Sequence, residues 1–201
     1  MRPPVLVPIV EGHSEVQSVP VLLRRLFAEM GRYELLVARP LRVGRYKIVR
    51  PGELERAIAL ARRRPKGCDA ILLLLDADDD CPKELAPDLL ERARQAGAGL
   101  LVAVVLAKSE FESWFLGSLE SLRGVRGLTE AAVSPARPED IRGAKEYLRR
   151  QMGPGYTYVE TDDQPALTSC FDLQLARRRC PSFDKFVRDI EMILAEMARD
   201  L

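Results

Sequence analysis

The sequence predicts an α/β fold, with a parallel β-sheet flanked by helices. Three apolar runs, residues 5–10, 71–75 and 100–106, are short and bounded by charged or turn-forming residues, as expected for strands buried on both faces. The segments between these runs carry apolar residues at helical spacing. Strands that alternate with helices are typical of a doubly wound parallel sheet with right-handed crossovers.

The first half of the chain is expected to form four strands that alternate with three helices, beginning and ending on a strand. Gly12 and the candidate cap Ser14 precede the first helix, and Gly97 ends the third. The basic segment 39–50 alternates in character and is expected to form a hairpin or an extended loop. The remaining expected elements are a strand at 34–38 and helices at 15–30, 53–64 and 83–96.

The second half of the chain is expected to be mainly helical. Helices are expected at 139–152 and 165–178, and a last helix is expected to begin near Cys180 and Pro181 with Ser182 as its N-cap. The sequence therefore predicts an α/β core over residues 1–118. A helical C-terminal extension over residues 119–201 is expected to pack on this core.

Composition argues against several classes of protein. The chain has 201 residues, 47% of them hydrophobic, which is ordinary for a globular protein. No apolar run approaches the ~20 residues of a membrane-spanning helix, and the N-terminus lacks the apolar core of a signal peptide. A cytoplasmic location without membrane contact is therefore expected. The four cysteines have no CxxC spacing and His13 is the only histidine, which argues against zinc.

Charge is distributed unevenly, although the net charge is only +1. Residues 1–66 hold 14 Lys and Arg against 6 Asp and Glu, whereas residues 67–91 hold 1 against 8. A metal-dependent enzyme that acts on a polyanion needs an acidic pocket for the metal and a basic region for the phosphates. The simpler interpretation of any single charged run is a solvated helix face.

The acidic region begins where the central apolar run ends. Asp76 and Asp78 are two residues apart, so their side chains leave an extended chain on the same face, and Asp80 follows. Like charges this close repel each other unless a cation lies between them, and carboxylate oxygens suit Mg²⁺ or Mn²⁺. The alternative is a solvated acidic loop that caps the next helix.

Carboxylates also follow the other predicted strands. Glu11 comes directly after the first strand, with Glu15 four residues later, and Glu110 follows the last strand beside the candidate helix cap Ser109. In open α/β sheets, ligands bind at the carboxyl ends of strands. Glu110 and Glu112 are about 200° apart on a helix, so at most one is expected to share the acidic site. Glu110 is favoured because it lies closer to the strand.

These residues resemble the Toprim domain of topoisomerases, bacterial primases and overcoming-lysogenization-defect (OLD) nucleases. In that family a glutamate after the first strand and a DxD motif after the third bind Mg²⁺. Glu11, Asp76 and Asp78 match these positions, and Asp80 is a candidate extra ligand. Glu15 matches the second acid of the first motif in the nuclease branch.

The chain resembles more closely a bacterial Toprim-like family, the one numbered 4276 among domains of unknown function. The matching segments span nearly the whole chain and are Val10-Glu11-Gly12 with Glu15, the Asp76 cluster, and residues 110–115, 145–148 and 179–183. This resemblance implies a Toprim-like Rossmannoid sheet and a metal site. It implies no reaction, because that family has no established one.

The Toprim resemblance implies a Mg²⁺- or Mn²⁺-dependent nuclease or phosphotransfer protein that acts on DNA or RNA. Its catalytic residues would be Glu11, Asp76 and Asp78, and Glu15 and Glu110 would be placed to hold a second ion. A partner ATPase is a further expectation, because OLD-like proteins combine both activities in one chain. The candidate phosphate contacts are four cations, each of which could equally be an ordinary exposed loop residue: Arg42, Arg45, Lys47 and Lys108.

Three other interpretations stay open. A non-catalytic interaction module is one, because Toprim domains in recombination mediators bind partners without cleaving anything. A haloacid-dehalogenase phosphatase also places DxD after an apolar strand, but its motif normally starts the fold, and Asp79 stands where Thr or Val is usual. A receiver domain shares the acidic pocket, and Lys108 could serve as its lysine, but it also needs Thr or Ser at a strand end.

Overall fold

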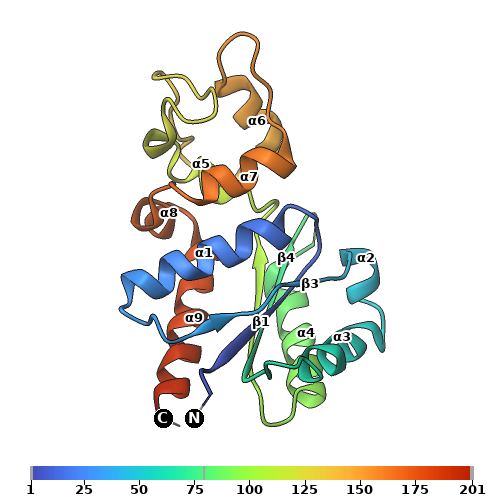
Figure 1. The fold of residues 1–201 in the computed structure, drawn as a ribbon. Coiled ribbons are helices and arrows are strands. Elements are labelled where there is room, and N and C mark those ends of the chain that lie inside the picture. Colours follow the sequence, from blue (N-terminus) through green and yellow to red (C-terminus); the bar gives the residue numbers. More distant parts are fainter. Residues whose placement is uncertain (1, 79, 200–201) are drawn as a thin grey trace.

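The predicted parallel sheet is present, and helices cover both of its faces (Figure 1). The structure is a computed structural model that describes residues 2–78 and 80–199, and within them the sheet has five strands in the order β2-β1-β4-β5, with β3 also paired to β1. All pairs are parallel, so the predicted α/β class is confirmed. The strands are β1 (Val5–Val10), β2 (Leu36–Val37), β3 (Leu41–Arg42), β4 (Ala70–Asp76) and β5 (Leu101–Ala107).

The register of the central strands brings their carboxyl ends to one edge of the sheet. Val10 at the end of β1 lies opposite Leu74 of β4, and Asp76 at the end of β4 lies opposite Ala107 of β5. The amide of Ala77 continues this ladder by donating to the carbonyl oxygen of Ala107 at 2.8 Å. The residues that follow β1, β4 and β5 are therefore neighbours in space.

Alternation along the strands divides the apolar core into two layers. Leu72 and Leu74 of β4 face one layer, whereas Leu73 and Leu75 face the other. Helices α1 (Glu15–Glu29) and α9 (Pro181–Arg199) cover the first face, and α3 (Glu53–Arg62) and α4 (Pro82–Ala96) cover the second (Figure 1). Among the described residues, no helix is both long and apolar enough to cross a membrane.

The helices between β5 and α9 gather beyond the carboxyl ends of the strands, above α1 in Figure 1. Trp114 lies at the centre of a buried aromatic cluster, with ring centroids 4.8 Å from Phe111, 5.0 Å from Phe183 and 5.3 Å from Phe186. This cluster connects the segment after β5 to α9. The elements of this region are α5 (Ser113–Leu116), two 3-10 turns (Leu119–Leu122 and Pro138–Asp140), α6 (Ala144–Gln151), α7 (Glu160–Thr168) and α8 (Leu173–Arg179).

The chain does not leave the sheet for good after residue 118. Helix α9 returns to it, and the Lys185 ammonium of α9 donates to the carbonyl oxygen of Val104 in β5 at 2.9 Å. The division into residues 1–118 and 119–201 stays a prediction.

The expectation for the basic segment 39–50 is wrong. It contains the short strand β3, in which Arg42 pairs with Val10, followed by α2 (Arg45–Ile48). The strand pairs with β1 rather than with its own neighbour in sequence, and local alternation cannot reveal such a distant partner. Ile48 is buried and anchors α2 against the second core layer.

Two of the expected C-terminal helices are each divided. The segment 165–178 contains the end of α7 and most of α8, because the chain turns at residues 169–172 and Asp172 caps α8 by accepting from the Leu175 amide at 2.8 Å. The segment 139–152 contains a 3-10 turn, a loop and α6. The hydroxyls of Ser109 and Ser182 make tertiary contacts rather than helix caps: Ser109 Oγ donates to the Glu139 carbonyl, and Ser182 Oγ accepts from Trp114 Nε1 at 2.9 Å.

Candidate functional site

The first part of the site lies in the turn between β1 and α1. The carboxylate of Glu11 reaches across to β4, where its Oε2 accepts a hydrogen bond from the Asp76 amide at 3.2 Å. Gly12 follows, and a Cβ at this position would lie 2.1 Å from Glu15 Oε2. The buried carboxylate of Glu15 thus occupies the space that a side chain at position 12 would need, and a larger residue there would displace it.

The second part lies at the end of β4. The Asp76 side chain is buried, and its Oδ1 accepts from the Phe111 amide at 2.8 Å. Burial raises the pKa of Asp76 well above its usual value, and the nearby carboxylates of Glu112, Glu11 and Glu15 raise it further. Asp76 thus joins the ends of β1, β4 and β5.

The loop after Asp76 has an unusual backbone. Asp78 has φ of 50° and Ser109, after β5, has φ of 65°. The Asp78 amide donates to the Ser109 carbonyl at 3.0 Å, so these two left-handed residues support each other. Left-handed backbone at residues other than glycine is uncommon and concentrates at functional sites. Asp79, which belongs to the acidic run that follows the strand, lies outside the described residues.

The third part comes from the C-terminal region and is centred on Glu112, which is fully buried. Its Oε1 accepts from Tyr158 Oη at 2.8 Å and from Gln164 Nε2 at 3.1 Å. Gln164 Nε2 also lies 3.5 Å from Glu15 Oε1, which links α7 to α1. Lys145 of α6 forms an ion pair with Glu160 at 2.8 Å and interacts electrostatically with Glu112 and Asp76.

We call the carboxylates of Glu11, Glu15, Asp76 and Glu112 the acidic centre. Burial raises the pKa of Glu112 to about 7, against the opposing effects of Lys145, Tyr158 and Gln164. Burial likewise raises the pKa of Glu11 to about 6, with further increases from Asp78 and Glu15. Burial alone would lower the pKa of Lys145, but its carboxylate neighbours raise it, so the ammonium stays charged. Lys145 acts on Glu112 and Asp76, and Arg45 acts on Glu11, so two cations oppose four carboxylates, and the excess of carboxylates favours a further cation.

The donor set of the acidic centre suits a hard divalent cation. Glu15 Oε2 and Glu112 Oε2 are buried and have no hydrogen-bond partner in the part of the chain that the structure describes. Within residues 2–78 and 80–199, no three His, Cys, Asp or Glu side chains have the spacing to enclose one ion. Mg²⁺ keeps several waters and commonly takes only one or two carboxylates from a protein. A Mg²⁺ ion here would be held by one or two of these carboxylates and by waters.

The predicted metal ligands divide between two places. The structure brings Glu11, Glu15 and Asp76 together, whereas Asp78 and Asp80 are exposed on the loop beyond and form ion pairs with Arg45. Glu110 accepts from the Ala144 amide at 3.0 Å, at the start of α6. With Asp78 it lines a separate shallow pocket of about 200 Å³.

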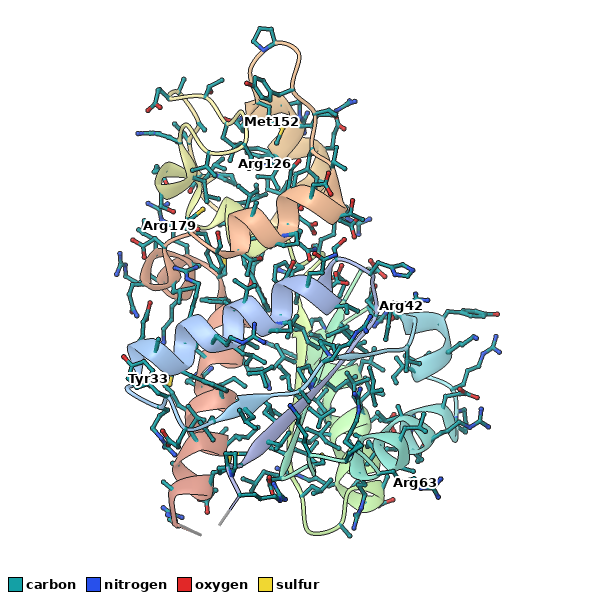
Figure 2. The ribbon with its side chains drawn as sticks, viewed as in Figure 1. Tyr33, Arg42, Arg63, Arg126, Met152 and Arg179 are labelled. Carbon is teal, nitrogen blue, oxygen red and sulfur yellow. The ribbon has the colours of Figure 1, made fainter. Side chains whose placement is uncertain are left out.

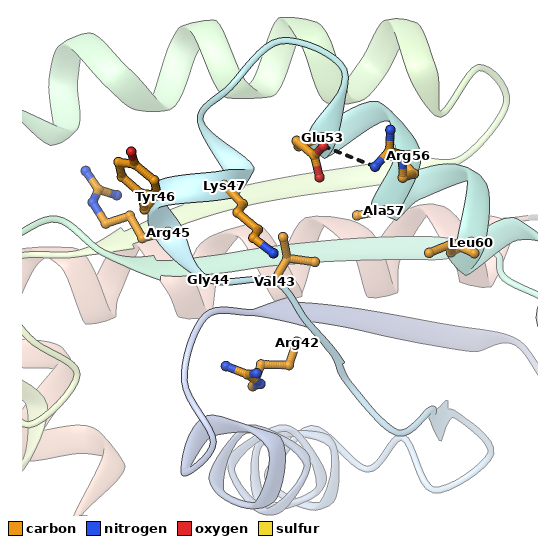
Figure 3. Close-up of a pocket in the computed structure, with 10 residues that line it drawn as sticks. All are labelled: Arg42, Val43, Gly44, Arg45, Tyr46, Lys47, Glu53, Arg56, Ala57 and Leu60. Carbon is orange, nitrogen blue, oxygen red and sulfur yellow. Dashed lines mark hydrogen bonds and ion pairs between the residues drawn. The ribbon is translucent and has the colours of Figure 1, made fainter.

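Three of the four predicted phosphate contacts line one pocket beside the acidic centre, shown in Figure 3. It has a volume of about 470 Å³ and lies between α2 and α3. The fourth contact, Lys108, lies elsewhere and pairs with Asp140 at 2.7 Å. We call the cavity between α2 and α3 the basic pocket. Its principal lining residues are Arg42, Arg45, Tyr46, Lys47, Arg56 and Leu60.

Sequence reasoning missed four residues of the site. Glu112 was weighed against Glu110 and not favoured, and Lys145, Tyr158 and Gln164 were not proposed at all. A buried glutamate inside the aromatic run 111–115 is a signal that could have favoured Glu112, since an acid among core aromatics needs partners. No local pattern marks the other three, because they approach the strand ends only through the packing of α6 and α7.

Comparison with known proteins gives one match. A family model described as a domain of unknown function, DUF4276, matches residues 10–191. This range contains the acidic centre, the basic pocket and all of the C-terminal residues that contact Glu112. No curated protein and no solved structure matches the chain.

Proposed function

The chain belongs to the DUF4276 family of domains of unknown function, and from this premise we propose that it is a Toprim-like, Mg²⁺-dependent nuclease or phosphotransfer protein. Its substrates are nucleic-acid phosphodiesters, either DNA or RNA. Mn²⁺ is the alternative ion, because it has the same preference for carboxylate oxygens.

The observation that supports this proposal is the meeting of Glu11 and Asp76 across β1 and β4. Glu11 Oε2 accepts from the backbone amide of Asp76 at 3.2 Å, so the carboxylate that follows β1 lies against the end of β4, at the carboxyl edge of the sheet. Their raised pKa values mark an environment in which negative charge is poorly compensated. Raised pKa values together with buried carboxylate oxygens that lack a hydrogen-bond partner are typical of metal or catalytic sites.

Each residue has a distinct chemical role in this proposal. Asp76, with the buried Glu15 carboxylate near it, would hold the metal ion, which when bound would supply a Lewis acid for the phosphodiester oxygen. Asp78, the other predicted ligand, lies on the exposed loop in its ion pair with Arg45. With a pKa of about 6, Glu11 is mostly ionised at neutral pH, and its carboxylate can accept a proton from an attacking water. Glu15 adds negative charge from α1, and Arg45 restrains the exposed loop through its ion pairs with Asp78 and Asp80.

The test is cleavage of plasmid DNA and of single-stranded DNA and RNA by the full chain with Mg²⁺, Mn²⁺ or EDTA. Wild type is expected to cleave only with a divalent ion. Asp76→Asn and Glu11→Gln are expected to lower the rate by about 100-fold or more, because each removes an acid from the reacting site. Titration calorimetry with Mg²⁺ gives a second readout, in which Asp76→Asn is expected to lose the binding heat.

The matched control is Glu84→Gln, an exposed glutamate on α4 outside the acidic centre. It should cleave and bind Mg²⁺ like wild type. Equal inactivity, or equal activity, of all four proteins contradicts the nuclease proposal. Circular dichroism of each variant separates loss of chemistry from loss of fold.

A second candidate function is a non-catalytic Toprim-like module that works with a partner ATPase or a nucleic-acid complex. The observation that favours it is Lys145, whose ammonium already lies in the field of Glu112, Asp76 and Glu160. A built-in cation can neutralise buried carboxylates without a metal ion. In that case Mg²⁺ produces no binding heat, and wild type leaves every nucleic acid intact.

A further inference from the structure

The basic pocket has the composition of a site for single-stranded nucleic acid rather than of an ordinary charged surface. Four cations, Arg42, Arg45, Lys47 and Arg56, face one acid, Glu53. In the part of the chain that the structure describes, Arg42 and Lys47 have no ion-pair partner, whereas Arg56 pairs with Glu53 at 3.1 Å. Unpaired cations around a cavity are available to phosphates.

The pocket also offers an aromatic surface, which a simple phosphate site does not need. Tyr46 is 75% exposed, and the Arg50 guanidinium lies over its ring at 4.2 Å from the centroid. Leu60 on the opposite wall is 51% exposed. An exposed ring that is held in place by a stacked guanidinium is a platform for an unpaired base.

The pocket is joined directly to the acidic centre. The Val43 amide donates to the Val10 carbonyl at 2.8 Å, so the pocket wall begins beside the residue that precedes Glu11. Arg45 lines the pocket and also forms ion pairs with Asp78 and Asp80. Within residues 2–78 and 80–199, its buried Nη1 has no hydrogen-bond partner. A chain that occupies the pocket therefore passes next to the proposed metal ligands.

We propose that the basic pocket binds a single-stranded segment of the substrate, with a base on Tyr46 and the adjoining phosphates on Arg42 and Lys47. This inference rests on the proposed function, because it defines the substrate of that site as single-stranded. A duplex keeps its bases stacked on one another and leaves the Tyr46 ring without a partner. An acidic peptide matches the charge but not the exposed ring.

The test is fluorescence anisotropy of the full chain with a labelled single-stranded DNA or RNA oligonucleotide in EDTA. Single strands are expected to bind at least about 5-fold more tightly than the duplex of the same sequence. Tyr46→Ala is expected to weaken binding by about 5- to 100-fold, whereas Tyr46→Phe keeps the ring and the affinity. Lys47→Gln and Arg42→Gln should each weaken binding and reduce the slope of log K against log salt by about 0.7.

Two matched controls lie away from the pocket. Tyr33→Ala removes a ring that is 79% exposed, and Arg63→Gln removes an exposed cation at the end of α3, and both labelled residues lie apart from Arg42 in Figure 2. Both variants should bind like wild type. The proposal is overturned if Tyr46→Ala binds as wild type does, if duplex and single strand bind equally, or if polyglutamate displaces the oligonucleotide at equal charge concentration.

The metal-free assay separates this inference from the proposed function. If the protein binds single strands through Tyr46 but cleaves nothing, the binding role of the basic pocket stands and the nuclease proposal fails. If the protein cleaves with Mg²⁺ but Tyr46→Ala changes neither binding nor cleavage, the nuclease proposal stands and the binding role of the basic pocket is contradicted.

Discussion

The acidic centre and the basic pocket lie at the same edge of the sheet and are connected by Arg45, yet they are built in opposite ways. The acidic centre is buried except for the half-buried Glu11, and its residues come from α1, β4 and the segments after β1 and β5, with partners from the region of α6 and α7. The basic pocket is largely exposed, and all its residues come from the single stretch 42–60. One therefore depends on the whole fold, and the other on a local segment.

Because one region is buried and the other is exposed, their charged groups interact with different strengths. Burial raises the pKa of the carboxyl groups in the acidic centre and makes every hydrogen bond to them consequential. In the basic pocket the cations other than Arg45 are exposed to water, so their individual contacts are weak and screened by salt. Substitutions in the first should change stability and chemistry, whereas substitutions in the second should change affinity alone.

The largest expected effect is on the aromatic cluster that supports the acidic centre. Trp114→Ala removes a fully buried ring in contact with Phe111, Phe183 and Phe186, and it is expected to destabilise the protein by about 3–5 kcal/mol. Urea unfolding measures this difference. Tyr46→Ala in the basic pocket should cost less than about 1 kcal/mol. Similar losses at the two positions would contradict the contrast between the two regions.

A smaller effect is expected from a single hydroxyl. Tyr158→Phe removes the hydrogen bond to Glu112 Oε1 and is expected to destabilise the protein by about 1–3 kcal/mol, because a buried carboxylate loses a donor. Tyr46→Phe is the matched control, since the Tyr46 hydroxyl is exposed and its loss should leave the denaturation midpoint unchanged. A Tyr158→Phe midpoint equal to that of wild type would show that Glu112 does not need this donor.

The smallest effect is expected at Glu120, a carboxylate that is treated in the opposite way to those of the acidic centre. Burial acts against its ionisation, but hydrogen bonds from Ser134 and Arg179 outweigh burial and lower its pKa to about 2. Because this value lies below the usual 4.5, ionised Glu120 stabilises the fold above about pH 4.5, and the stabilisation is lost as the pH falls toward 2. The pair is partly exposed, so its contribution is about 1 kcal/mol.

Glu120→Gln should therefore be less stable than wild type at pH 7, and the difference should shrink as the pH falls from 5 to 2. Urea unfolding at several pH values measures the trend. Glu130→Gln, an exposed glutamate in the same region, serves as the control and should show no such convergence. A difference that grows on acidification would mean that the Glu120 pKa is raised rather than lowered.

Much of the fold could be predicted from residue patterns because its signals are local. The apolar runs that form β1, β4 and β5 and the amphipathic spacing of α1, α3, α4 and α9 are each contained in one segment. Strand β3 and the break between α7 and α8 were not predicted, because each depends on a partner distant in sequence. Register with β1 selects the first, and the Arg25 guanidinium of α1 donates to the carbonyl oxygens of Thr168 and Phe171 at the turn that separates α7 from α8.

The sequence by itself determined the α/β class, the family and the strand ends at which Glu11 and Asp76 lie, because carboxylates that directly follow apolar strands leave a strong local pattern. Only the tertiary structure decided which other groups share their environment. Glu110 and Glu112 are both glutamates and only two residues apart. Glu112 is nevertheless buried against Tyr158 and Gln164, whereas Glu110 accepts from the amide at the start of α6. Burial and partner choice are properties of the packed chain, and they set the charge of the site.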